Sequence, residues 1–510
     1  MRFNILIGGK AGQGINKVSE IISKILSEYG YFTFGYRDYQ SMIRGGHNFN
    51  IICFSDEWVA SHESKIDFLI ALDDNTLKEH KDKLKKDSVI LKYNEFESLG
   101  KNLNIALAGS LVKILGIEKH ALIKEIGKEF NKESVDAAEK GFDSQKERIH
   151  LEKIDRKIRI LNGSKAAAIG AINSNLDLLI AYPMTPATGL INELANFEAE
   201  KKKLVVFQTE SEVAGINQAL GASFSGAVAM TGTSGGGFDL MTEGLSFAGQ
   251  AEIPIVIYLA SRPGPSTGIP TYTSQDDLNV ALRAGHGDFP RVVVAPGDAL
   301  ECEEKTNEAF YLSYGYNIPS IILTDKHLAE SEFSNDKKIN KILSVKINRK
   351  IPGKEIVKAS SYEHDSFGNT TESGEIAKRN AESRVKKYEK IKKEIEKLEP
   401  IKLYGNKNSK NLVISFGSTK GAILNAISQE NLDCGFLQVI YLKPLSGRIK
   451  KLMEKSKNLI LVEQNVTGQL GRLLREKTGI SIKEKNRILK YDGRPFTSDE
   501  LAKEIRRRLR

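Results

Sequence analysis

The sequence has very few cysteines. Only three occur in 510 residues, Cys53, Cys302 and Cys434, and they are far apart with no C-x-x-C pair. A four-cysteine iron–sulfur site needs four thiolates, so this chain cannot provide one by itself. Each cysteine lies in or beside an apolar segment, and we expect all three to be small buried hydrophobic residues.

Long apolar runs are also absent. No stretch approaches the roughly 18 residues that span a bilayer. Residues 1–7 run directly into a strand pattern, without the apolar core or the small-residue cleavage site of a signal peptide. We therefore expect a cytoplasmic protein. The hydrophobic share of 40% and the charged share of 27% are ordinary for a globular chain, and the length predicts about three domains.

No nucleic-acid-binding motif is present, although the formal net charge is +10. Many of the lysines lie in residues 330–410 and 446–510. A positive field favours anionic ligands and acidic protein partners. A solvated lysine-rich surface is an equally good interpretation. We expect small molecules and proteins as partners, and neither nucleic acid nor membrane.

The chain is organised around residues 181–188, Ala-Tyr-Pro-Met-Thr-Pro-Ala-Thr. The apolar run 176–181 is typical of a buried strand. The two prolines after it each fix φ and favour an extended preceding residue. The resulting stiff loop displays the hydroxyls of Thr185 and Thr188 before a helix begins near Gly189. In parallel α/β sheets ligands bind beyond the carboxyl ends of strands, so we expect a binding loop here; a structural turn is the alternative.

A glycine-rich loop follows the first strand pattern. It reads Gly8-Gly9-Lys10-Ala11-Gly12-Gln13-Gly14 and precedes an amphipathic helix. A glycine loop at a helix N-terminus suits an anion, although the spacing G-x-G-x-x-G is not met. Nucleotide binding and a structural tight turn both remain open. Further on, Met42-Ile43-Arg44-Gly45-Gly46-His47 precedes a strand, and we expect His47 to be a hydrogen-bonded turn residue.

Two acidic residues follow the strand pattern at 204–208. Glu210 and Glu212 lie at the start of a small-residue helix, where a carboxylate complements the helix dipole. That structural role is one interpretation. The next strand pattern, at 227–231, leads into Gly232-Thr233-Ser234-Gly235-Gly236-Gly237. We expect this segment to be a loop that lets a ligand or another backbone come close, or a structural turn.

An irregular loop with one cation follows the apolar strand 255–259. It runs from Ser261 to Thr271 as SRPGPSTGIPT and contains Arg262. An arginine can hold a carboxylate through two parallel hydrogen bonds, although a lone loop arginine is usually solvated. Patterns at 291–294, 299–314 and 318–324 complete a parallel α/β unit and predict a doubly wound sheet.

The last part of the chain contains a linker and another α/β region. The linker includes SYEHDSFGNTTE at 361–372 and a charged helix at 378–399. One stripe of that helix predicts packing against a neighbour, and it consists of Val385, Tyr388, Ile391, Ile395 and Leu398. Strand and helix patterns alternate after residue 409, and VEQNVTGQ spans 462–469.

These stretches, in this order, resemble the 2-oxoacid:ferredoxin oxidoreductases. YPMTPAT is similar to the family motif YPITPS(S/T), and the loop that begins at Arg262 is similar to RGGPSTGLPT. Residues 463–469 are similar to the family segment VEQNxxGQL, and residues 361–372 are similar to LEHDExGxxTE. The glycine loop and the RGG stretch resemble the gamma domain. The resemblance covers most of the chain and departs from the family pattern at Ala187, Gly236 and Pro263.

The resemblance implies an α/β fold with four segments. These are a Rossmann-like gamma domain associated with coenzyme A at 1–160, a thiamine-diphosphate pyrimidine-type doubly wound domain at 161–335, a linker with a charged helix at 336–408, and a transketolase C-terminal-like α/β domain at 409–510.

The same resemblance implies roles for particular residues. Glu212, rather than Glu210, would activate thiamine diphosphate by a hydrogen bond to its pyrimidine ring. Arg262 would hold the substrate carboxylate and Thr185 would orient the substrate. Other substrate-lining residues would be Tyr182 and Thr271. The residues near coenzyme A would be Gly9, Gly12, Gly14 and Arg44. Residues expected to face a partner subunit are Gln275 and Asp276.

A magnesium-bound diphosphate site is usually written G-D-G, and no G-D-G occurs in this sequence. The resemblance therefore implies a split site, in which a beta subunit supplies the diphosphate site, the magnesium and the iron–sulfur cluster, and this chain supplies no metal ligand. The implied activity is oxidative decarboxylation of a 2-oxoacid with coenzyme A and ferredoxin. The fused gamma–alpha order favours 2-oxoglutarate and succinyl-CoA, in a heterodimer or a dimer of heterodimers.

Several alternatives remain from the sequence. The substrate could be pyruvate or a branched-chain 2-oxoacid. A complete thiamine decarboxylase is disfavoured by the missing G-D-G. From a different class, the chain could be a non-catalytic scaffold subunit, because the family pattern is altered at Ala187, Gly236 and Pro263.

Overall fold

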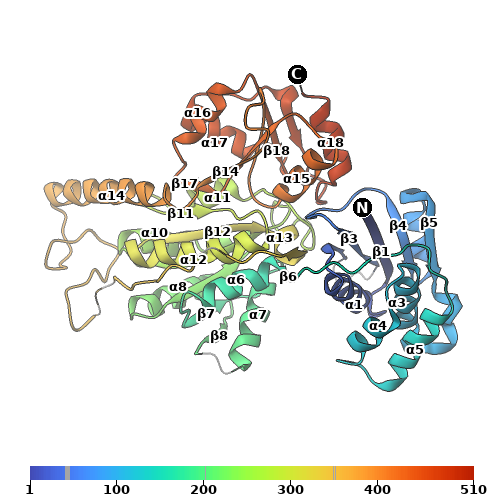
Figure 1. Ribbon diagram of the computed structural model, residues 1–510. Helices are drawn as coiled ribbons and strands as arrows, with labels where there is room; N and C mark the ends of the chain where they lie inside the picture. The colour runs from blue at the N-terminus through green and yellow to red at the C-terminus, as the bar shows by residue number, and fades with distance from the viewer. Residues whose placement is uncertain (41–45, 201–202, 340, 349, 351, 510) are drawn as a thin grey trace. The chain divides into compact units, whose positions relative to one another are not determined.

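A computed structural model describes the chain except for residues 41–45, 201–202, 340, 349, 351 and 510 (Figure 1). The contacts divide the described residues into two compact units. The first unit consists of Met1–Leu161, Ser331–Lys338 and Phe496–Leu501, and the second contains the rest. The sequence-based division into four domains stays a prediction.

The first unit is built on a mixed seven-stranded sheet with the order β5-β4-β1-β3-β2-β13-β6. Strand β1 is parallel to β4, and β3 is antiparallel to both β1 and β2. The strands are β1 (Arg2–Lys10), β2 (Phe32–Asp38), β3 (His47–Ser55), β4 (Ile66–Ala71), β5 (Leu84–Lys92), β6 (Arg159–Asn162) and β13 (Glu332–Asn335). The helices are α1 (Ile15–Glu28), α2 (Asp74–His80), α3 (Leu103–Ile114), α4 (Lys119–Ile126) and α5 (Lys132–Asp143).

The second unit contains the doubly wound sheet, with the order β17-β11-β12-β10-β9-β7-β8. Its strands are parallel except β17, which pairs antiparallel with β11. They are β7 (Leu178–Ala181), β8 (Val205–Gln208), β9 (Ala229–Thr233), β10 (Ile255–Ser261), β11 (Val292–Val294), β12 (Pro319–Asp325) and β17 (Tyr441–Lys443). The associated helices are α6 (Gly163–Ile172), α7 (Thr188–Ala199), α8 (Glu212–Phe224), α9 (Gly235–Leu240), α10 (Thr242–Gln250), α11 (Leu278–Arg283), α12 (Ala299–Tyr316) and α13 (Lys326–Glu330).

A five-stranded sheet forms the rest of the second unit, with the order β14-β16-β15-β18-β19. Its strands are β14 (Ile401–Gly405), β15 (Asn411–Ser415), β16 (Gly435–Val439), β18 (Asn458–Glu463) and β19 (Arg487–Leu489). The helices of this region are α15 (Thr419–Gln429), α16 (Arg448–Lys455) and α17 (Gln469–Thr478). Helix α18 (Ser498–Arg506) contributes residues to both units, since its part up to Leu501 is assigned to the first. These three sheets confirm the α/β class.

One strand ties the two sheets of the second unit together. Strand β16 belongs to the five-stranded sheet, and β17 follows it almost at once but pairs with β11, with Val293 opposite Lys443. Residues from both sheets also share one hydrophobic cluster. The segments 161–335 and 409–510 therefore share a core.

The linker is fastened to the second unit through helix α14 (Gly374–Ile395). Lys387 of this helix pairs at 2.8 Å with Glu252, just before β10. Within the linker, Glu363 accepts a hydrogen bond from Asn380 at 2.8 Å. Ile391 and Ile395 are buried, as the helix pattern predicts. The prediction was wrong for Val385, whose exposed fraction is 64%, because the buried stripe is narrower than the apolar pattern suggests.

The three cysteines are fully buried, which confirms their expected place in the core. Within the described residues, none of the helices combines the length and the apolar character that crossing a bilayer requires.

Candidate active site

Glu212 is the first residue of helix α8 and lies just beyond the carboxyl end of β8. The helix begins here because the Ser211 hydroxyl caps it, accepting a hydrogen bond from the Ala214 amide at 3.2 Å. Glu212 is 4% exposed, and its Oε1 has no hydrogen-bond partner among the described residues. An unsatisfied buried acceptor is costly, so this oxygen suits a ligand that donates a hydrogen bond.

The second glycine-rich segment packs against this carboxylate. A Cβ atom on Gly237 would lie 2.6 Å from Oε1 of Glu212 and 2.1 Å from Oγ1 of Thr233. The absence of a side chain at Gly237 therefore makes room for the glutamate. The expected loop was wrong: Gly232 and Thr233 belong to β9, and Gly235 begins helix α9.

Gly236 is the position where the family usually has proline. The atom nearest to a Cβ built there is the carbonyl oxygen of Ser266, at 3.8 Å, which is an ordinary contact distance. A side chain would fit at this position, so the glycine meets no steric demand of the described structure.

Arg262 reaches the central loop from the start of the loop that follows β10. Its Nη1 donates a hydrogen bond to the carbonyl oxygen of Thr185 at 2.9 Å. Burial lowers the pKa of Arg262, while the nearby carboxylates of Asp277 and Glu212 act in the opposite direction. Three predicted residues, Thr185, Arg262 and Glu212, are thus brought into one neighbourhood. One bond to Thr185 leaves other donors of the guanidinium for a ligand.

The other two predicted substrate residues lie at the ends of their loops. Tyr182 is 36% exposed, directly after β7. Thr271 is buried at the far end of the loop that starts at Arg262. It precedes Tyr272, whose ring lies 3.7 Å from the Arg494 guanidinium. Their contact with a substrate stays a prediction.

Asp277, which was not among the site residues predicted from the sequence, also lies in this neighbourhood. Burial, and then Asp276 and Asp239, raise the pKa of Asp277 to about 6, while Arg262 opposes that rise. Its Oδ2 has no hydrogen-bond partner among the described residues, and a Cβ on Gly235 would lie 2.4 Å from its Oδ1. The available signal was the Asp-Asp pair before an apolar helix, but its burial depends on packing.

Gln275 does not face outward, so its expected contact with a partner subunit was wrong. It is 3% exposed, and its amide donates to the Phe416 carbonyl oxygen at 2.8 Å. The side-chain oxygen Oε1 of Gln275 accepts a hydrogen bond from the backbone amide of Gln464 at 2.9 Å. The glutamine instead joins the two sheets of the second unit.

The first glycine loop is shorter than predicted, because β1 continues through Gly9 to Lys10. A Cβ on Gly9 would lie 2.4 Å from Oε1 of Gln13. Gly14 has φ +78°, and a Cβ there would lie 2.2 Å from the Asn104 amide nitrogen. These two glycines meet demands of the protein itself. Gly12, with φ +91°, has open space around it.

Two residues of the same region complete the sequence-based predictions. Arg44 lies outside the described residues. His47 is the first residue of β3, and its Nε2 lies 2.8 Å from Nε2 of His80. That contact is in line with a hydrogen-bonded structural role for His47.

Comparisons with known proteins agree with this architecture. The family profile of pyruvate ferredoxin/flavodoxin oxidoreductase matches residues 4–129. The thiamine-diphosphate-binding profile of pyruvate flavodoxin/ferredoxin oxidoreductase matches residues 169–400. The fold is also similar to that of a 2-oxoglutarate:ferredoxin oxidoreductase from Magnetococcus marinus, solved with 2-oxoglutarate, coenzyme A and succinyl-CoA bound, with a TM-score of 0.87, 23% identity and 100% of both chains covered.

Sequence relatives identify the family. The chain is 42% identical to the 2-oxoglutarate synthase subunit KorA of Archaeoglobus fulgidus over 34% of this chain and 51% of the relative. It is 31% identical to the 2-oxoacid:ferredoxin oxidoreductase subunit alpha of Sulfolobus sp. over 99% of this chain and 96% of the relative. Since this second match spans nearly the whole of both proteins, the chain belongs to the 2-oxoacid:ferredoxin oxidoreductases, as an alpha subunit.

Proposed function

We propose that this chain is the catalytic alpha subunit, with a fused gamma region, of an enzyme that oxidatively decarboxylates 2-oxoglutarate. The products would be succinyl-CoA and carbon dioxide, with ferredoxin as electron acceptor. The observation that carries this proposal is the buried, unpartnered Oε1 of Glu212 in the neighbourhood of Arg262 and Thr185. The names of the relatives support the substrate class.

The residues around Glu212 fit thiamine diphosphate. When bound, thiamine diphosphate supplies the electron sink for decarboxylation. Oε1 of Glu212 would hold the pyrimidine ring through a hydrogen bond, which removes the cost of the unsatisfied acceptor. Gly237 keeps the space that the carboxylate needs, and the surroundings of Gly236 are open.

Arg262 would bind the carboxylate group of the 2-oxoacid. Its guanidinium is partly buried and is oriented by the Thr185 carbonyl oxygen. A hydrogen bond between two charged groups is stronger where water is partly excluded. Thr185 would place the keto group, and Tyr182 and Thr271 would line the site. The pKa of the neighbouring Asp277 is raised to about 6, so this carboxyl would hold a proton at a higher pH than an ordinary aspartate.

A second subunit would complete the site. Large apolar side chains are exposed around Glu212 and on the edge strand β8, an arrangement typical of protein interfaces. They are Tyr182, Val205, Phe207, Val213, Leu240 and Ile269. We infer that a beta subunit covers this surface in a cytoplasmic complex and provides the diphosphate site, magnesium and an iron–sulfur cluster. Coenzyme A would approach the open Gly12 and Arg44.

The experiment is to purify the chain with a partner that contains G-D-G and four cysteines. Coenzyme A-dependent reduction of a viologen dye is then measured with 2-oxoglutarate, pyruvate and branched 2-oxoacids. We expect the highest kcat/KM with 2-oxoglutarate and no turnover in Glu212→Gln, which should still assemble. A complex without turnover on any of these acids would favour a scaffold subunit and contradict the proposal.

A further inference from the structure

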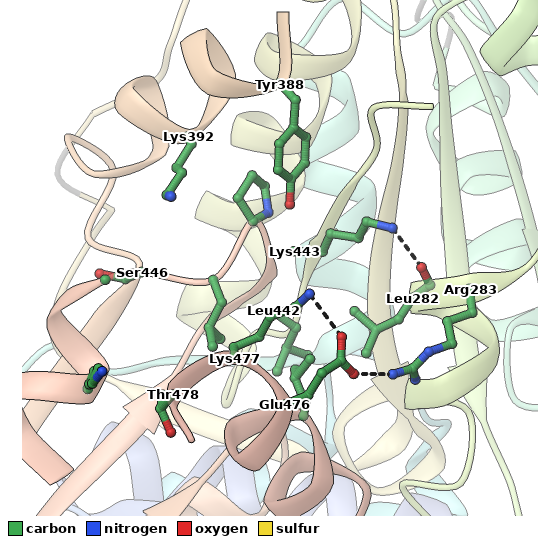
Figure 2. A pocket seen from close by; sticks show the side chains of 15 residues that line it. Leu282, Arg283, Tyr388, Lys392, Leu442, Lys443, Ser446, Glu476, Lys477 and Thr478 are labelled. Carbon is green, nitrogen blue, oxygen red and sulfur yellow. Dashed lines mark hydrogen bonds and ion pairs between the residues drawn. The ribbon is translucent and has the colours of Figure 1, made fainter. Parts of the chain in front are cut away.

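A cationic pocket lies in the second unit, away from the residues of the candidate active site. It has a volume of about 400 Å³ and is enclosed by α11, α14, α16, α17 and the end of β17 (Figure 2). That volume falls in the range of small-molecule sites. Five cationic side chains line it: Arg283, Lys392, Lys443, Lys450 and Lys477.

The positive charge of the pocket is poorly compensated. Among the described lining residues, Glu476 is the only carboxylate. It already pairs with the guanidinium of Arg283 and, at 2.9 Å, with the ammonium of Lys477 (Figure 2). One carboxylate thus serves two cations, and Lys450 pairs at 3.9 Å with Glu454, which is not a lining residue. Lys392 and Lys443 contribute further positive charge.

The pKa of Lys443 reflects both burial and the neighbouring cations. Its Nζ donates a hydrogen bond to the Leu282 carbonyl oxygen at 2.8 Å. Burial, and then the cations Arg291, Lys477 and Arg283, lower the pKa of Lys443 to about 8. A bound anion would stabilise the ammonium form, because an opposite charge at short range favours ionisation.

Arg291 is a further buried cation next to Lys443, although it is not among the residues that line the pocket. It is 3% exposed, its guanidinium lies 4.3 Å from the centre of the Phe289 ring, and burial lowers its pKa to about 10. It immediately precedes β11, the strand that pairs with β17 at Lys443. Its charge therefore adds to the positive potential at Lys443, which does line the pocket, and a perturbed cation in a concave site often marks a ligand position.

The remaining walls suit an organic phosphate rather than a bare ion. Helix α16 begins at Arg448, beside the lining residues Ser446 and Gly447. The amides of Arg448 and Ile449 already donate to Ser446, each at 3.3 Å, so the helix start favours an anion mainly through its dipole. Tyr388 extends from α14 toward Lys443, and Leu442 lies on the opposite wall (Figure 2). Leu442 itself is only 1% exposed, so the apolar surface next to the charges comes from the Tyr388 ring and from the half-buried lining residue Leu445.

We propose that this pocket binds a small organic phosphate, such as a nucleoside phosphate. The phosphate groups lie between Lys443, Lys477 and the start of α16, and the organic part lies against Tyr388 and Leu445. None of the lining residues is among those proposed to hold thiamine diphosphate, the 2-oxoacid or coenzyme A, and the inference does not depend on the proposed activity.

The test is isothermal titration of the chain–partner complex with ADP, inorganic pyrophosphate and sulfate. Thiamine diphosphate, magnesium and coenzyme A are present at saturation, so that the other phosphate positions are filled. We expect one ADP per chain and weaker binding of pyrophosphate. Lys443→Met combined with Lys477→Met should weaken ADP binding at least tenfold. Lys451→Met, on the same helix as Lys450 but outside the lining, should leave ADP binding unchanged.

Several results would overturn the proposal. These are an absence of ADP and pyrophosphate binding, equal affinity for sulfate and ADP, or equal weakening by Lys451→Met and the double variant. Binding by the isolated chain but not by the complex would also contradict the proposal, because the partner subunit would then cover this face in the enzyme. If Lys443 were only structural, Lys443→Met alone would lower the thermal unfolding midpoint and leave ADP binding intact.

Discussion

The carboxylate of Glu212 occupies the space that a side chain on Gly237 would need. A Cβ atom there would lie 2.6 Å from Oε1 of Glu212 and 2.7 Å from its Cγ. The two residues come from different helices, α8 and α9. The orientation of the proposed catalytic carboxylate therefore depends on a glycine 25 positions further along the chain.

Gly237→Ala should disable the enzyme without unfolding it. The added methyl group displaces Glu212, and a misplacement of about 1 Å costs on the order of 10²-fold in rate. The measurement is kcat for 2-oxoglutarate in the complex, together with thermal unfolding. Gly221→Ala, on the exposed side of α8 with no atom within 4 Å of the new Cβ, is the matched control and should keep full activity. Equal rates in the two variants would contradict this role of Gly237.

Arg262→Lys should act mainly on substrate binding. A point charge cannot reproduce the planar fork of a guanidinium, and losing a charged hydrogen bond costs about 1.5–3 kcal/mol. That loss of free energy corresponds to a rise of roughly 10- to 100-fold in KM for 2-oxoglutarate. The change in kcat should be smaller. Steady-state kinetics at saturating coenzyme A measure both. Arg448→Lys is the control, because Arg448 is exposed and pairs with Glu396. An unchanged KM in Arg262→Lys would place the substrate carboxylate elsewhere.

The division between what the sequence predicts and what it does not has physical causes. Long periodic segments such as 212–224 and 299–316 were placed almost correctly, because amphipathicity and apolar runs are local signals. Strand β17 has three residues, too few for a periodic signal, and its place beside β11 is a long-range pairing. Strand β13 joins the sheet of the first unit from more than 290 residues beyond β2, with Phe333 opposite Phe34.

The candidate site shows the same division. Thr185, Glu212 and Arg262 could be predicted from the sequence because each follows a recognisable strand pattern and matches a family motif. Asp277 was missed, since nothing in the sequence shows that it would be buried between Gly235 and Arg262. The structural constraints on Gly9 and Gly14 also come from distant side chains, Leu72 and Asn104.

Lys420→Met should strongly destabilise the second unit. The ammonium of Lys420 is buried and pairs with Glu301 at 2.7 Å and with Asp298. Removing it leaves two buried carboxylates without their shared cation, which costs about 3–5 kcal/mol. Urea denaturation followed by circular dichroism measures the loss. The companion variant Lys402→Met, whose side chain is more exposed, should cost clearly less, and similar losses in both would contradict the account.

The contribution of Glu301 to stability should depend on pH. Burial alone would raise its pKa, but the ammonium groups of Lys420 and Lys402 and a hydrogen bond from Gln438 outweigh burial and hold the pKa well below its ordinary value of 4.5. The folded state therefore gains stability from ionised Glu301 above pH 4.5, and this gain is lost as the pH falls below that value. The difference in unfolding free energy between wild type and Glu301→Gln should shrink between pH 6 and pH 3. A constant difference would contradict this assignment.

The central claim is that Glu212 activates thiamine diphosphate in a site that a beta subunit completes. Its most direct test is proton exchange at C2 of thiamine diphosphate. It is measured by NMR in the complex of this chain with its beta subunit, for wild type and Glu212→Gln. We expect Glu212→Gln to retain the cofactor but to slow exchange on the order of 10²-fold or more, the size of an acid–base contribution. Exchange at the wild-type rate in Glu212→Gln, or rapid exchange in the isolated chain without a partner, would contradict the central claim.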